Sequence, residues 1–366
     1  MARQYLIEPV GVGAPADVAA AMCGAHAQIL SAAELSIGLR IAGADREVVR
    51  RALWEDRTLV KTFGPRGTVH LLPAVDLPMW TGALSGLASS TPARPDPVRF
   101  TTEQTEEVLA AIGDALAGSE LTVDELTEAI VDRVGAWAGE RTMDAFQDKW
   151  PRWRQLTSSA AHRGVLCFGP VRGRRVTYTH PRRWLPGFSP EGAEKALHNL
   201  VRGYLYAYGP ATPAHLAKWL NIPVRSAIDL LAASEAVHLE GEQAWVNPGD
   251  TTTPDEGPRG VRLLPYFDAF VVASQPRLRL FAGAAATRAL AGGQAGNYPV
   301  VLVDGVVGGV WHQRRAGSRL ALTVELLCDL TPSQRKALDD QVGLVGAVTQ
   351  ANPTLTLGPV KVGPHA

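Results

Sequence analysis

The sequence predicts an α+β fold with three winged-helix units in tandem, followed by a β-rich C-terminal domain. The chain has 366 residues, which is enough for about two to four domains with sizeable cores. Amphipathic helices followed by a hairpin with Gly or Pro near its turn occur three times. Beyond about residue 260 the apolar residues recur with the period of two that is typical of strands.

The composition is typical of a soluble protein from a reducing compartment. No window of 18 apolar residues exists, and the N-terminus lacks a signal-peptide pattern, so we expect neither a membrane span nor secretion. Cys23, Cys167 and Cys328 are far apart without CxxC spacing, and the histidines lack metal-ligand spacing. This pattern fits the cytoplasm and argues against a zinc cluster, so no metal and no cofactor are expected.

Charge is distributed unevenly along a chain whose net charge is zero. Twelve acidic residues lie between Glu103 and Asp148, whereas residues 149–184 carry one lysine, eight arginines and no acidic residue. A positive stripe on a neutral protein is typical of binding to a phosphate backbone. The alternative is that the stripe pairs with the acidic helices that precede it.

Residues 1–90 are predicted to form an N-terminal segment and the first winged helix. Ser31 and Glu34 have the spacing of a capping box, and Asp45 is a favourable N-cap. Arg66, in the turn of the hairpin, is expected to point at the backbone of a partner. The predicted elements are an irregular leader over 1–25, a helix after Ser31, a helix from Asp45 through Trp54, and strands over 58–63 and 68–72 around a turn at 64–67.

Residues 91–188 are predicted to form a second, basic winged helix. Its hairpin has a very basic tip, Gly169-Pro-Val-Arg-Gly-Arg-Arg175. The predicted elements are a linker over 88–100, helices over 102–117, 122–134 and 150–164, and strands over 165–168 and 176–179.

Residues 189–250 are predicted to form the third winged helix. Its helix-turn-helix is the clearest fold signal in the chain, with Thr212 as cap and Pro213 at the first helical position. Arg225 is the only basic residue on the helix that begins at 224, so this unit is expected to serve more as a structural scaffold than as a unit that recognises DNA. The predicted elements are helices over 192–208, 212–220 and 223–233, and a hairpin over 237–245.

Residues 258–366 are predicted to form the β-rich C-terminal domain, after a linker over 249–260. Asp304-Gly305 is a favourable hairpin turn. The predicted elements are strands over 261–264, 269–273, 300–303, 306–311, 320–324 and 354–362, with one helix over 332–345.

Five dispersed segments resemble the bacterial tandem winged-helix family that contains the AlkZ-like DNA glycosylases. The resemblance spans about residues 20–315 and implies three winged helices and a β-rich domain around a concave DNA channel. The segments are Arg66-Gly-Thr-Val-His-Leu-Leu-Pro73, Arg163-Gly-Val-Leu-Cys-Phe-Gly-Pro170, Tyr204–Thr212 with His215–Trp219, Arg262-Leu-Leu-Pro-Tyr-Phe-Asp268 with Arg277, and Val301–Gly308 with Trp311.

The resemblance also implies an activity and a site. The family excises bulky N7-alkylguanine adducts and unhooks crosslinked guanines, often as self-resistance to a genotoxic natural product. Its Gln-x-Gln or Gln-x-Asp motif falls on His26-Ala27-Gln28 here. The imidazole at the first position is similar to a variant subclass that acts on bulky monoadducts, which puts crosslink unhooking in doubt.

The sequence therefore predicts a monofunctional DNA glycosylase that acts as a monomer on duplex DNA carrying alkylated guanine. His26 and Gln28 are the expected catalytic residues, with no lysine nearby for a lyase step. The expected DNA contacts are Arg66, Arg152, Arg154, Arg163, Arg172, Arg174 and Arg175.

Other interpretations stay open at this point. The chain is alternatively a non-enzymatic DNA-binding protein, such as a transcriptional regulator, or a protein that sequesters a genotoxin directly. Asp268 is either functional or a structural carboxylate that is tied to Arg277.

Overall fold

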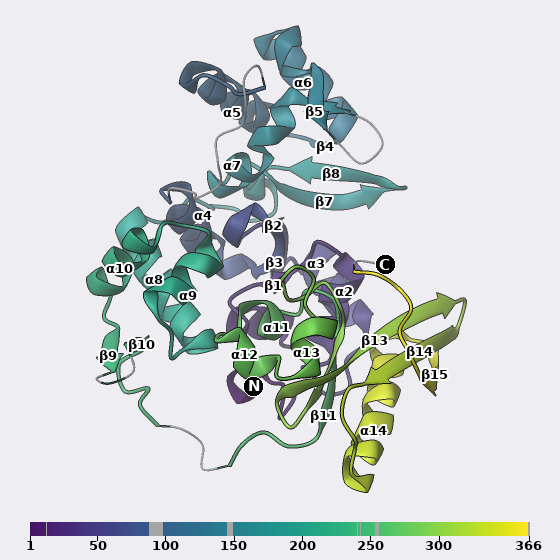
Figure 1. The fold of residues 1–366 in the computed structure, drawn as a ribbon. Coiled ribbons are helices and arrows are strands. Elements are labelled where there is room, and N and C mark those ends of the chain that lie inside the picture. The colour runs from purple at the N-terminus through teal and green to yellow at the C-terminus, as the bar shows by residue number, and fades with distance from the viewer. Residues whose placement is uncertain are drawn as a thin grey trace. The chain divides into compact units, whose positions relative to one another are not determined.

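The computed structural model describes residues 1–11, 13–87, 98–144, 149–239, 241, 243–252 and 256–364 (Figure 1). The chain folds into two compact units, and each is built from segments that are distant in the sequence. Unit 1 comprises Met1–Leu59, Arg202–His215 and Glu235–Ala366, and unit 2 comprises Val60–Val201 and Leu216–Ser234. Helices and strands are mixed throughout, so the predicted α+β class is confirmed.

The N-terminal segment of unit 1 is more regular than predicted. It contains η1 (Ala2–Gln4), α1 (Pro15–Ala21), β1 (Ala25–His26), α2 (Leu30–Gly38) and α3 (Arg46–Trp54). The prediction of an irregular leader over 1–25 is wrong for α1, because its proline lies at the first helical position, where no N–H is needed.

The two predicted helix caps of this segment have different outcomes. Asp45 caps α3 as predicted, since its carboxylate accepts hydrogen bonds from the backbone N–H groups of Glu47 and Val48. The predicted capping box at Ser31 is wrong, because α2 already begins at Leu30. Glu34 is buried instead and accepts a hydrogen bond from the Arg50 guanidinium at 2.7 Å.

Unit 1 is built around a five-stranded sheet in the order β11-β12-β13-β14-β15. Neighbouring strands are antiparallel except β14 and β15, which are parallel and joined through α14. Asp304 and Gly305 form the β12–β13 turn as predicted, and both have positive φ. The elements are β11 (Val261–Leu264), β12 (Val300–Val303), β13 (Val306–Ala316), β14 (Arg319–Leu326), α14 (Pro332–Thr349) and β15 (Asn352–Leu357).

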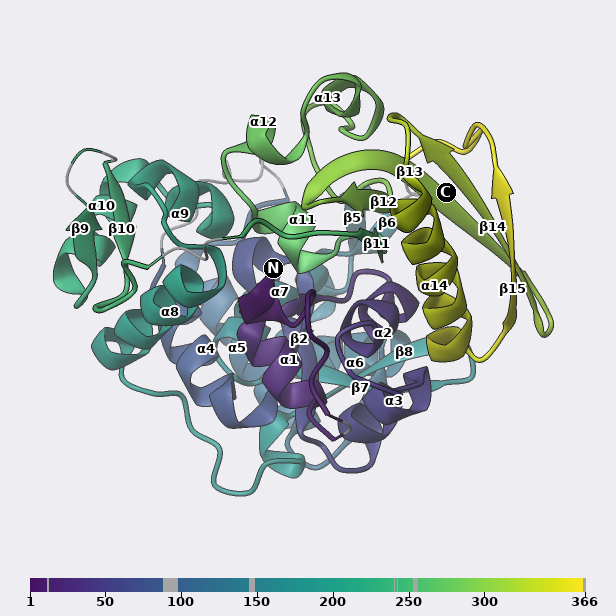
Figure 2. The ribbon, with the colours of Figure 1, turned by 90° about the horizontal axis from the view of Figure 1, so that it is seen from below.

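Each face of this sheet packs against helices (Figure 2). On one face, apolar side chains of α14 and of α2 bury the sheet around Trp311. On the other face lie α11 (Ala269–Ala273), α12 (Arg277–Leu280) and α13 (Ala284–Arg288). The predicted strand over 269–273 is wrong, because a five-residue apolar run does not distinguish strand from buried helix.

The segment from α8 to β10 passes through both units. It contains α8 (Ala193–Tyr208), α9 (Pro213–Leu220), α10 (Val224–Ala233), β9 (Val237–Leu239) and β10 (Ala244–Val246). Thr212 accepts a hydrogen bond from the His215 N–H, so the predicted cap of α9 is confirmed. Residues 240 and 242, in the predicted turn between β9 and β10, lie outside the described residues.

Unit 2 begins within β2 and contains a three-stranded sheet in the order β4-β8-β7 (Figure 1). Thr122 caps α6 with a complete capping box. The elements of unit 2 up to residue 201 include β2 (Leu59–Phe63), β3 (Val69–Pro73), α4 (Leu77–Ser85), α5 (Thr102–Leu116), β4 (Glu120–Thr122), α6 (Val123–Val134), β5 (Arg141–Asp144), β6 (Lys149–Pro151), α7 (Thr157–His162), β7 (Cys167–Arg172) and β8 (Arg175–Thr179).

The segment that precedes β7 in unit 2 is less helical than predicted. The predicted basic helix over 150–164 is wrong in part, because Pro151 ends β6 and a 3-10 helix over Arg152–Leu156 precedes α7. Most of the predicted linker over 88–100 lies outside the described residues. The winged-helix interpretation and the four-part division of the chain stay predictions.

In the described part of the chain, no helix has the length and apolar character that crossing a membrane requires.

His70 is a buried histidine of unit 2, with 1% of its surface exposed. Its Nδ1 lies 2.8 Å from the Thr68 carbonyl oxygen, so the ring donates a proton there. Burial, reinforced by the positive charge of Arg66, lowers the pKa of His70 from 6.5 to about 3. The folded protein therefore holds this imidazole neutral at physiological pH.

We expect acid destabilisation from this site. The His70 pKa is higher in the unfolded chain than in the folded protein, so protonation below pH 6.5 favours the unfolded chain. The stability that depends on a neutral His70 is therefore fully present above pH 6.5 and is lost as the pH falls towards 3. Between pH 8 and pH 5 the free energy of unfolding should fall by about 2 kcal/mol more in the wild type than in His70→Gln, which stays neutral. Urea titrations at both pH values measure this difference, and equal losses in the two proteins would contradict it.

Candidate functional site

The His26 motif lies in a short extended segment between α1 and α2. The helix α1 ends in a tight turn at Cys23 and Gly24, whose φ angles are +52° and +95°. Ala25 and Ala27 are 1% and 0% exposed, whereas His26 is half-buried and Gln28 is exposed. Because side chains of extended backbone alternate, the two alanines anchor the segment in the core and direct His26 and Gln28 to the other side.

The end of α8 holds the turn before this motif. The Tyr208 hydroxyl donates a hydrogen bond to the Met22 carbonyl oxygen at 2.5 Å. Burial raises the pKa of Tyr208 well above its usual value, so this donor keeps its proton at any working pH. The position of the turn is therefore fixed by tertiary contact within unit 1 as well as by α1.

A buried ion pair joins the turn that follows α2 to the segment before α11. The Arg40 and Asp268 side chains are both fully buried and form a bidentate pair with N–O distances of 2.8 and 2.9 Å. Arg40 also donates to the carbonyl oxygens of Gln4 and Ser36, and the Ser36 hydroxyl donates to Asp268 at 2.7 Å. Each charge is thus compensated by several hydrogen bonds, which a buried ion pair requires.

This pairing corrects one prediction from the sequence. Asp268 was expected to be tied to Arg277 if it was structural, but its partner is Arg40. Arg277 instead donates to the backbone carbonyl oxygens of Val271, Val272 and Ser274 and so holds the end of α11. The carboxylate also caps α11, because it accepts a hydrogen bond from the Phe270 N–H.

The loop that ends at Asp268 brings an aromatic ring to the motif. The Phe267 ring centroid lies 6.4 Å from that of the His26 imidazole, with 36° between the planes. Tyr266 lies beside Phe267, with its centroid 6.3 Å away. Phe267 was not predicted as a site residue, although it lies within the segment Arg262–Asp268 that carries part of the family resemblance.

Three of the predicted DNA contacts, all in unit 2, are engaged with its fold. Arg66 is half-buried and donates to the Trp219 carbonyl oxygen at 2.6 Å. Arg152 donates to two backbone carbonyl oxygens and lies over the Phe100 ring at 4.7 Å. Arg154 lies 4.0 Å from the centroid of the Trp150 ring.

Three others pair with acidic side chains of α5 and α6, as in the alternative interpretation of the charge stripe. Arg163 pairs with Glu106, and Arg172 pairs with Glu125 at 2.8 Å. Arg175 lies 3.9 Å from Asp124. Arg174, at the exposed tip between β7 and β8, makes no hydrogen bond or ion pair within the described chain. The assignment of all seven arginines to DNA contact stays a prediction.

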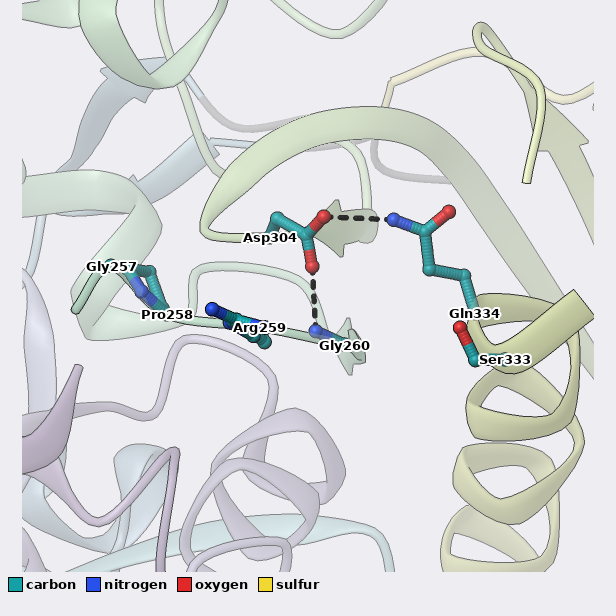
Figure 3. A pocket seen from close by; sticks show the side chains of 7 residues that line it. All are labelled: Gly257, Pro258, Arg259, Gly260, Asp304, Ser333 and Gln334. Carbon is teal, nitrogen blue, oxygen red and sulfur yellow. Dashed lines mark hydrogen bonds between the residues drawn. The ribbon is translucent and has the colours of Figure 1, made fainter. Parts of the chain in front are cut away.

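Unit 1 has a surface pocket that is separate from the predicted site residues. It is lined by Gly257, Pro258, Arg259, Gly260, Asp304, Ser333 and Gln334 (Figure 3). The Asp304 carboxylate accepts hydrogen bonds from the Gly260 N–H and from the Gln334 amide, which fastens the β12–β13 turn to its neighbours. None of the predicted site residues lines this pocket. Within the described ranges, no group of three or more His, Cys, Asp or Glu side chains could hold a metal ion.

Comparison with known proteins gives consistent matches over most of the chain. Residues 19–348 match the family described as "DNA glycosylase AlkZ-like". A curated protein of Streptomyces sahachiroi, named "Interstrand DNA cross-link repair glycosylase", is 32% identical over 331 residues, which cover 85% of each chain. The solved structure of Streptomyces sahachiroi DNA glycosylase AlkZ is similar with a TM-score of 0.77 and 26% identity, covering 98% of this chain and 97% of that one.

We expect Asp268→Asn to destabilise unit 1, because it leaves the buried charge of Arg40 without its counter-ion. The expected loss is about 3–5 kcal/mol in the free energy of unfolding. Glu106→Gln is the matched control, since its ion pair with Arg163 is 54% and 45% exposed and should contribute at most about 1 kcal/mol. Chemical denaturation of both variants tests this, and a loss for Asp268→Asn no larger than that of the control would be inconsistent with the predicted role of the pair.

Proposed function

The chain belongs to the AlkZ-like DNA glycosylase family, and we propose that it excises bulky N7-alkylguanine adducts from duplex DNA, using His26 and Gln28. That it is a DNA glycosylase of a repair family follows from its membership. The substrate class and the residue roles are the proposed part. The observation that carries the proposal is that His26 and Gln28 share the solvent side of a segment whose alanines are fixed in the core.

The chemistry of the substrate sets what the protein must supply. An N7-alkylated guanine is cationic, so the base is already a good leaving group and needs no general acid. The enzyme has to place a water molecule and stabilise the oxocarbenium-like sugar that forms as the glycosidic bond breaks. One proton acceptor and one polar side chain that orients the water are sufficient for this reaction.

His26 and Gln28 supply these two groups. The imidazole of His26 accepts a proton from the attacking water, which is general-base catalysis. The Gln28 carbonyl oxygen accepts a hydrogen bond from the same water, while its amide group donates to the DNA. The half-buried position of His26 restricts its access to bulk water, and the exposure of Gln28 lets its amide reach the DNA.

Duplex DNA carrying the adduct is the proposed partner, and the protein acts as a monomer. A bulky adduct is poorly suited to extrusion into a closed pocket, so recognition is proposed to occur within the duplex. The exposed Arg172–Arg175 tip of the β7–β8 hairpin supports a role in holding the phosphate backbone, since Arg174 has no ion pair to give up within the described chain.

Crosslinked guanine is the second candidate substrate. One relative is named an interstrand DNA cross-link repair glycosylase, and it is 32% identical to this chain. His26 is the first residue of the motif, where the resemblance implies Gln most often, and this difference favours monoadducts. A duplex with a single interstrand crosslink, tested beside the monoadduct, decides between the two.

We expect base release to depend on both members of the motif. Single-turnover release from duplex carrying an intercalator-linked N7-guanine adduct should fall about 10²–10⁴-fold in His26→Ala, because the general base is lost. Gln28→Ala should also slow release, since the water loses an orienting partner. The measurement is the yield of abasic sites after alkaline cleavage.

The matched controls separate catalysis from folding and binding. Ser31→Ala, at an exposed position near the motif, should keep the wild-type rate. Duplex carrying 7-methylguanine reports whether a small adduct suffices. Tight binding to undamaged DNA without release of either base would leave a non-enzymatic DNA-binding protein, and binding of the free genotoxin without DNA would favour sequestration.

We expect Arg174→Ala to weaken DNA binding through one phosphate contact. The slope of log K against log salt concentration should become shallower by about 0.9 for duplex DNA. Arg133→Ala is the control, because Arg133 is an exposed arginine of α6 outside the predicted contact set. Fluorescence anisotropy between low and moderate salt measures both slopes, and identical slopes for the two variants would remove Arg174 from the interface.

A further inference from the structure

We infer that Phe267 is a positioning residue for His26, holding the imidazole in the orientation that base release requires. This inference rests on the proposed function of His26. The two rings come from segments more than 200 residues apart in the sequence, and their contact lies within unit 1. Phe267 acts on the reaction through His26 rather than by touching the reacting atoms.

The backbone of Phe267 is held in an unfavourable conformation. Its φ is +55°, in the left-handed region, which is a genuine outlier for a bulky residue. Such conformations cost about 1–3 kcal/mol and persist where the surrounding structure imposes them. Here the Phe267 N–H donates to the Gly296 carbonyl oxygen at 2.9 Å, and the next residue is Asp268, fixed by Arg40.

Gly296 packs tightly against the loop that carries Phe267. A Cβ on Gly296 would lie 2.7 Å from a Val272 methyl carbon and 3.3 Å from the Phe267 Cα. The φ of Gly296 is +94°, so glycine is favoured both by space and by conformation. The backbone of Phe267 is therefore held by Gly296 and by the neighbouring Asp268, which Arg40 fixes.

The Phe267 ring is partly exposed and lies close to the His26 imidazole. Phe267 is half-buried and belongs to neither of the two apolar clusters around the described sheet of unit 1. Its distance of 6.4 Å from the imidazole falls in the range of about 4.5–7 Å over which aromatic rings pair. The backbone of a strand leaves more than one rotamer open to a side chain, so an adjacent ring adds a restraint on the orientation of the His26 imidazole.

The test uses variants that differ in the ring but tolerate the backbone. Phe267→Gly removes the ring and also relieves the left-handed strain, so it should fold. Phe267→Tyr keeps the ring. Phe267→Gly should slow single-turnover release of the bulky adduct about 10–100-fold, because a small misplacement of a catalytic group has that effect. Phe267→Tyr should stay near the wild-type rate, and the Kd for adduct DNA should be unchanged in both.

A double-mutant cycle distinguishes positioning from any other role. If Phe267 acts through His26, then adding Phe267→Gly to His26→Ala should cause no further loss of rate. If the two losses multiply, or if Phe267→Gly weakens DNA binding as much as it slows release, then Phe267 acts independently and the inference is overturned. A wild-type rate in Phe267→Gly would overturn it as well.

The same measurements separate this inference from the proposed function. A slow His26→Ala together with a wild-type Phe267→Gly leaves the proposed function intact and removes only the role of Phe267. A wild-type rate in His26→Ala removes the proposed role of His26, and the positioning role falls with it. Thermal unfolding of each variant verifies that the rates compare folded proteins.

Discussion

The buried ion pair of Arg40 and Asp268 is the contact on which the candidate active site depends. Burying two charges is costly, and attraction between them repays the cost only when the remaining hydrogen-bonding groups are satisfied. Here Ser36, the Gln4 carbonyl oxygen and the Phe270 N–H complete the set. Arg40, just after α2, and Ser36, within α2, both bond Asp268 and so tie the helix that follows the His26 motif to the loop that carries Phe267. Two segments without local connection thereby become one site.

Much of the fold could be predicted from the sequence where local chemistry decides it. Asp45 and Thr212 cap helices as expected, and Asp304-Gly305 makes its hairpin turn, because each feature depends on a few adjacent residues. The errors arose where tertiary contacts decide. The run 269–273 reads equally as strand or helix, and its helical state depends on a cap from Asp268 and on burial against the sheet.

The candidate site was predictable only in part, for the same physical reason. The motif at His26 and Gln28 follows from a resemblance carried by short segments, and the alternation of burial around it agrees with the proposed use. The partner of Asp268 and the approach of Phe267 to His26 join residues more than 200 positions apart. The basic stripe over residues 149–184 shows the same limit. Its charge was visible in the sequence, but the sequence alone did not distinguish binding to a phosphate backbone from pairing with acidic residues such as Glu106 and Glu125.

The interleaved order of the two units has a consequence for how the protein is made on the ribosome. Unit 2 has all its segments once Ser234 has been synthesised, whereas unit 1 still lacks its central sheet at that point. Arg40 emerges 228 residues before Asp268, which at ordinary elongation speeds is a delay of roughly 10–50 s. During that interval the nascent N-terminal helices carry a cation whose burial has no counter-ion. The His26 motif is thus synthesised well before the loop that ends at Asp268, and it gains the support of that loop only after the loop has been translated.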